Sequence, residues 1–125
     1  MQFISTPDAP TPAGHYSQAV EVDGMVFVSG MLPTLSQASG ATMSFDDQVR
    51  SAMGHSEKIL SAAGCSLNDV VQCTAYIVGI ANWPAFNRVY SELLGPHKPA
   101  RAVVPVPELH HGALVEIQLV ARVPG

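Results

Sequence analysis

Two apolar stretches near the end of the chain, residues 98–104 (KPARAVV) and 114–119 (LVEIQL), direct the interpretation of the whole sequence. Both are rich in Val, Ile and Leu, which is typical of β-strands in the interior of a sheet. Arg101 interrupts the first apolar run and Glu116 interrupts the second. A lone charge in such a strand is costly to desolvate unless something pairs with it. Either the two side chains pair with each other, or they face a pocket where a ligand takes part of that role.

The composition predicts a protein that associates with copies of itself. The chain has 125 residues, which predicts one domain over residues 1–125, and 47% of them are hydrophobic while only 13% are charged. Soluble domains typically have about 25% charged residues. So few charges leave apolar surface that other subunits can cover, so we expect a homo-oligomer. A monomer with a polar but uncharged surface is the alternative, and the 10 Gly and 10 Pro leave room for it.

Several classes of function are disfavoured. The net charge is −4 and the basic residues are scattered, which argues against nucleic acid as the main partner. No apolar run approaches the roughly 18 residues of a membrane span, and the N-terminus does not resemble a signal peptide, so a cytoplasmic location is expected. Cys65 and Cys73 match no metal-binding spacing and are expected to be reduced thiols. Adjacent residues of an extended chain point in opposite directions, so His110 and His111 are not expected to share a metal.

Outward from these strands, local signals predict the other elements. Asp-Gly at 23–24, between apolar residues 18–22 and 25–29, is the signature of a two-residue hairpin. Residues 2–4 and 70–78 are predicted strands, and 30–42 a loop. Ser44 is expected to cap a helix that ends at Gly64, and Asn82 a second helix that ends at Gly95. The order β, ββ, α, β, α, β, β predicts an α+β domain: a mixed sheet with both helices on one face.

Five collinear motifs then resemble a known family: residues 14–20 (GHYSQAV), 28–33 (VSGMLP), 87–90 (NRVY), 99–101 (PAR) and 115–117 (VEI). They are similar to the Rid family of reactive intermediate deaminases, also called the YjgF family and once described as endoribonucleases. The resemblance runs over nearly the whole chain. It implies a chorismate-mutase-like fold and a homotrimer, whose sheets line a central barrel and whose clefts lie between subunits.

The resemblance also implies roles for single residues. Arg101 would hold the carboxylate of the substrate, Glu116 would hold and activate a water, and Tyr16 would close the cleft from the adjacent subunit. The implied activity is hydrolysis of a 2-imino acid, or its enamine tautomer, to a 2-keto acid and ammonia without a cofactor. Other positions implied to contact the substrate are Ser29, Gly30, Met31, Asn87 and Val103, the last through its main chain.

Departures from the family pattern leave the substrate open. His15 stands where proline is usual, Met31 where glutamine is usual, and Val103 where members acting on simple imino acids often have cysteine. Together with the 110–111 histidines, these changes make a larger or more conjugated imine or enamine, such as an aminomuconate-type acid, equally plausible. A non-catalytic ligand-binding or chaperone-like trimer is the alternative function, since fold does not fix activity. A ribonuclease is disfavoured by the acidic charge.

Overall fold

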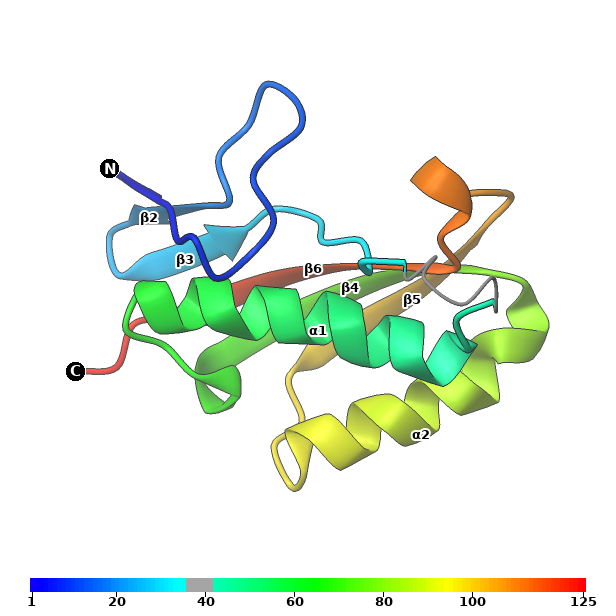
Figure 1. Ribbon diagram of the computed structural model, residues 1–125. Coiled ribbons are helices and arrows are strands. Elements are labelled where there is room, and N and C mark those ends of the chain that lie inside the picture. Colours follow the sequence, from blue (N-terminus) through cyan, green and yellow to red (C-terminus); the bar gives the residue numbers. More distant parts are fainter. Residues whose placement is uncertain (36–41) are drawn as a thin grey trace.

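The computed structural model describes residues 1–35 and 42–125, so residues 36–41 of the predicted 30–42 loop lie outside the described part. Six strands form one sheet in the order β1-β2-β3-β6-β4-β5, and both α-helices cover the same face of it (Figure 1). The predicted order of elements and the mixed α+β class are confirmed. The elements are β1 Gln2–Ile4, β2 Ala19–Val22, β3 Met25–Val28, α1 Phe45–Ala62, β4 Val70–Val78, α2 Trp83–Leu94, β5 Ala100–Val106 and β6 Val115–Arg122, with short turns of helix at Leu67–Asp69, Ile80–Asn82 and His110–Gly112.

The hairpin of β2 and β3 forms where the sequence predicts it. Val22 pairs with Met25 across the turn. Asp23 has φ 51° and Gly24 has φ 78°. Two positive φ angles at the central positions are the requirement of a type I′ turn, whose twist matches that of the strands it joins. This prediction is confirmed.

The two helices begin differently. Ser44 caps α1 as predicted, because its Oγ accepts a hydrogen bond from the Asp47 amide at 3.1 Å. Asn82 precedes α2, but its side chain donates to the Val78 carbonyl at 2.9 Å and accepts nothing from the helix. Asn82 is itself in the helical region of φ and ψ, so its side chain is not aimed at the first-turn amides. The predicted side-chain cap of the second helix is therefore wrong.

The strands β4 and β6 form the centre of the sheet, and their side chains alternate between its two faces. β6 pairs antiparallel with both β3 and β4, whereas β4 and β5 pair in parallel through the crossover that contains α2. The side chains beneath the helices are fully or almost fully buried: Cys73, Ala75 and Ile77 on β4, and Val115, Ile117, Leu119 and Ala121 on β6. The alternate positions, including Tyr76 and Glu116, lie on the open face of the sheet.

Strand β5 lies at the edge of the sheet, and its residues are exposed or half-buried throughout. It extends to Val106, two residues beyond the apolar stretch 98–104 of the sequence, so Pro105 lies within the strand. An edge strand tolerates proline because one side of its backbone has no partner in the sheet. No helix in the described part of the chain has the length and apolar character needed to cross a membrane.

Candidate functional site

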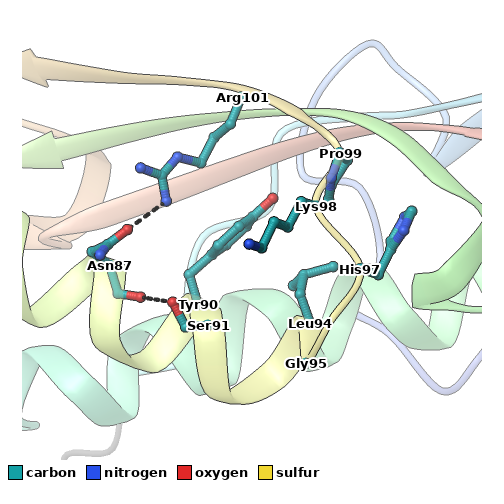
Figure 2. Close-up of a pocket in the computed structure, with 9 residues that line it drawn as sticks. All are labelled: Asn87, Tyr90, Ser91, Leu94, Gly95, His97, Lys98, Pro99 and Arg101. Carbon is teal, nitrogen blue, oxygen red and sulfur yellow. Dashed lines mark hydrogen bonds between the residues drawn. The ribbon is translucent and has the colours of Figure 1, made fainter.

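Arg101 lies on the helix-covered face of β5. It pairs in register with the buried Cys73 on β4, and neighbouring residues in register share a face. Its guanidinium Nη1 donates to the Oδ1 of Asn87 at 3.0 Å. Its Cζ lies 5.1 Å from the ring centroid of Tyr90 and 5.8 Å from that of Phe86. The guanidinium is thus oriented by a neutral amide and two aromatic rings, with no carboxylate beside it among the residues that the structure describes. Figure 2 shows the amide of Asn87 and the ring of Tyr90.

A cavity of about 310 Å³ opens beside this arginine, between α2 and the start of β5 (Figure 2). Its walls combine polar and apolar side chains, and the basic residues among them come from the segment 97–101. The residues that line it are Asn87, Tyr90, Ser91, Leu94, Gly95, His97, Lys98, Pro99 and Arg101. Val103, which pairs with Ala75, lies two residues further along the strand on the same face as Arg101 and is half-buried.

Beneath the arginine lie a buried thiol and a buried phenol. Burial raises the pKa of Cys73 to about 11, and the contacts with Tyr90 and Arg101 offset only part of that effect. Burial likewise raises the pKa of Tyr90, whose hydroxyl has no hydrogen-bond partner among the described residues. The thiol is near enough to Tyr90 to affect its pKa, but a thiol is a weak partner. Both groups therefore stay neutral near pH 7, and Cys73 does not act as a thiolate nucleophile.

Glu116 lies on the opposite face of the sheet from Arg101. It pairs with Tyr76 of β4, between the buried residues Val115 and Ile117, and is half-buried. Gly30 packs directly against its carboxyl group. A Cβ atom added to Gly30 would lie 3.0 Å from the Oε1 and 3.1 Å from the Cδ of Glu116. Glycine at position 30 therefore makes room for this carboxylate.

A second group of predicted site residues gathers around Gly30. Tyr16, Gly30, Met31 and His111 line a cavity of about 190 Å³. Tyr16 is 50% exposed, whereas Met31 is only 5% exposed and packs in the core, so Met31 contributes little surface to this cavity. The Ser29 hydroxyl donates to the Ser17 carbonyl at 2.6 Å. This hydrogen bond connects the end of β3 to the loop that contains Tyr16.

The predicted residues thus form two separate groups, one around Arg101 with Asn87 and Val103, and one around Glu116 with Gly30. Within the described residues no ion pair joins Arg101 to a carboxylate. The alternative in which Arg101 and Glu116 pair with each other in one chain is wrong, because they lie on opposite faces of the sheet. The alternative in which Arg101 faces a pocket is supported by the cavity beside it.

Two features were missed by the sequence analysis. His111 has φ 60°, in the left-handed region, and its ring lies 3.8 Å from that of His110 between centroids. The expectation that these rings point apart is wrong, because the chain is not extended there. Lys98 lines the cavity beside Arg101, and its place three residues before Arg101 was the signal available. No group of three or more possible metal ligands occurs within residues 1–35 and 42–125.

Comparison with known proteins shows which family the chain resembles. The family described as Endoribonuclease L-PSP matches residues 6–123. A RutC family protein of Pyrococcus horikoshii is 38% identical over 122 residues, 96% of this chain and 96% of that protein. The 2-iminobutanoate/2-iminopropanoate deaminase of Capra hircus is 37% identical over 122 residues, 96% of this chain and 88% of that protein. RidA from the Antarctic bacterium Psychrobacter sp. has TM-score 0.88 and 34% identity, covering 98% of this chain and 99% of that one.

Proposed function

Since the chain belongs to the Endoribonuclease L-PSP family, also known as the Rid or YjgF family, we propose that it hydrolyses 2-imino acids, or their enamine tautomers, to 2-keto acids and ammonia. The family includes imine deaminases, and the goat relative bears that activity in its name. The observation that carries the proposal is the geometry of Arg101, a guanidinium beside a cavity with a neutral partner and no carboxylate.

Arg101 would bind the carboxylate of the substrate. Its Nη1 is held by Asn87, and the other N–H groups of the planar fork can donate to both oxygens of a carboxylate. A hydrogen bond to a charged group contributes about 1.5–3 kcal/mol. Because the partner on α2 is an amide, the substrate does not have to break an ion pair to reach the guanidinium.

Glu116 would act on water. As a general base it takes a proton from a water molecule that attacks the C=N carbon, and the resulting carbinolamine loses ammonia once the nitrogen is protonated. Such proton transfer contributes about 10²–10⁴-fold to the rate. Gly30 has no side chain to displace the carboxyl group that packs against it, and Tyr16, half exposed at the neighbouring cavity, would close the site. The substrate brings the reactive bond, so no cofactor is required.

Two faces of one sheet cannot meet at one small ligand, so the complete site requires a second subunit. We propose a homotrimer of the chorismate-mutase-like type, with the open faces of three sheets around a central barrel and Arg101 of one subunit near Glu116 of the next. Apolar side chains left exposed on the strands support this assembly, among them Phe27 at 46%, Val71 at 42% and Val104 at 37% exposure. Covering them would stabilise the oligomer by the hydrophobic effect.

Ribonuclease activity, which the family description names, has less support. The net charge is −4. Arg50 and Arg88 are engaged with carboxylates on the two helices, so they offer little to a phosphate backbone. A protein that binds a small carboxylate, or acts like a chaperone, without hydrolysing an imine would share the same arginine geometry. An activity assay separates this alternative from the deaminase.

The assay generates 2-iminopropanoate from alanine with an amino-acid oxidase and follows its decay by semicarbazide trapping. The wild-type protein should accelerate the decay. Arg101→Lys should lose about 10²-fold or more of that acceleration, because an ammonium cannot reproduce the planar fork. Arg122→Lys is the matched control, since this arginine is exposed at the end of β6, and it should behave like the wild type. Equal rates for wild type and Arg101→Lys would show that catalysis does not occur at this arginine.

A further inference from the structure

We propose that the cavity between α2 and the start of β5 binds a second carboxylate of the substrate, so that the protein acts on imino or enamine dicarboxylic acids. Arg101 holds the carboxylate next to the imine and Lys98 holds the distal one. This inference rests on the proposed function, because it names the substrate class of that same site.

The charge of the cavity is one-sided. Lys98 and Arg101 both extend from the β5 side toward α2 (Figure 2), and no Asp or Glu is among the residues that line the space between them. Lys98 forms no ion pair within residues 1–35 and 42–125, in contrast to Arg50 and Arg88 on the helices. Two uncompensated cations in one concave site create a positive potential that favours a doubly charged anion over a singly charged one.

His97 does not compete for this role. Its Nε2 donates to the Val70 carbonyl at 2.7 Å, which ties the segment before β5 to the start of β4. That hydrogen bond holds the neighbouring Lys98 backbone in place at the mouth of the cavity. The imidazole thus anchors the segment, and the ammonium of Lys98 is the group left to meet a ligand.

The size and walls of the cavity fit a chain of several carbons between two carboxylates. At about 310 Å³ it lies within the roughly 300–1,000 Å³ of typical ligand sites, whereas a small monocarboxylic imine would leave much of it to water. Tyr90, Leu94 and Pro99 supply apolar wall. Lys98 and Arg101 line the same cavity three residues apart in the chain, and their long side chains can reach the two ends of a diacid.

The test compares two imines made in situ by amino-acid oxidases, one from alanine with a single carboxylate and one from glutamate with two. Lys98→Met keeps the apolar stem and removes the charge. It should raise the KM for the glutamate-derived imine about tenfold or more while the KM for the alanine-derived imine stays within about twofold. Lys58→Met on α1 is the matched control, because Lys58 is the other lysine of the chain, and it should change neither. A Lys98→Met effect that is absent, or equal for both imines, overturns the inference.

A binding measurement separates this inference from the proposed function. Calorimetric titration with glutarate and with butanoate requires no catalysis. The wild-type protein should bind glutarate about tenfold more tightly than butanoate, and Lys98→Met should remove that preference. If neither imine decays faster with the wild type, the proposed activity fails while this preference still tests the diacid site. No preference for glutarate, or one that survives Lys98→Met, rules out the diacid site whatever the activity.

Discussion

Two inactive variants should restore each other when they share an oligomer. Arg101→Lys removes the guanidinium proposed to bind the carboxylate on the helix side of the sheet, and Glu116→Gln removes the proposed general base on the open side. Each homo-oligomer alone should be nearly inactive. Because the two side chains lie on opposite faces of one sheet, the proposed site takes its arginine from one subunit and its glutamate from another. A mixed oligomer can therefore contain sites in which both groups are intact.

The size of the recovery follows from counting. In a random equal mixture, a site receives an intact arginine with probability one half and an intact glutamate from its neighbour with probability one half. About one quarter of the sites in a symmetric ring are then complete, so about 25% of wild-type activity should return. If each site took both groups from the same chain, every site would lack one of them and no activity would return.

The experiment unfolds the two variants together, refolds them and measures decay of the alanine-derived imine. Different affinity tags on the two variants allow the mixed oligomers to be purified, and light scattering gives their size. The control combines the two refolded variants without unfolding them together, and it should stay as inactive as the parents. Mixed oligomers that are no more active than their parents would refute the shared site between subunits.

Three further outcomes follow from single contacts. Gly30→Ala should lower kcat about a hundredfold, because the added methyl group displaces the Glu116 carboxyl, and Tm should change little. Gly54→Ala is the control, since Gly54 lies in α1 with open space around it. It should raise the free energy of unfolding by about 1 kcal/mol and leave kcat unchanged. Burial raises the pKa of Cys73 to about 11. The neutral thiol therefore contributes its full stabilisation of the folded state below about pH 8.5, and this contribution is lost as the pH rises to 11. Urea unfolding should show that the free energy of unfolding falls by about 2–3 kcal/mol over this range in the wild type and not in Cys73→Ala. Asn87→Asp should raise KM about tenfold or more, because a carboxylate 3.0 Å from the guanidinium competes with the substrate.

The elements predicted well are those whose signals are local. Asp23-Gly24 sets a turn with two positive φ angles, and Ser44 caps the helix that follows it. Both depend on a few adjacent residues, so a single sequence carries them. The prediction that Asn82 caps the second helix was wrong for a related reason. A side chain that can cap a helix can also form hydrogen bonds elsewhere, and here the Asn82 side-chain amide donates to the nearby Val78 carbonyl. The competing partner comes from the end of a different element.

The faces of the two charged strands illustrate what one sequence cannot give. Glu116 stands between two buried residues, so strict alternation already places it on the outer face. Arg101 stands between exposed alanines on an edge strand whose burial does not alternate. Its orientation follows from the pairing of β5 with β4 and from the packing of α2. Those are long-range contacts, and they decide that the two charges do not meet within one chain.

This separation has a chemical consequence for the proposed site. Had the arginine and the glutamate faced each other in the folded chain, they would form an ion pair that a substrate carboxylate would have to break. On opposite faces, the arginine is oriented by the neutral Asn87 and keeps its full charge for an anion. The carboxyl group of Glu116 packs against Gly30, where a side chain would crowd it. In the proposed site the sheet keeps Arg101 and Glu116 apart within one subunit, and the proposed assembly brings them together around a ligand, so neither side chain is occupied by the other before the substrate binds.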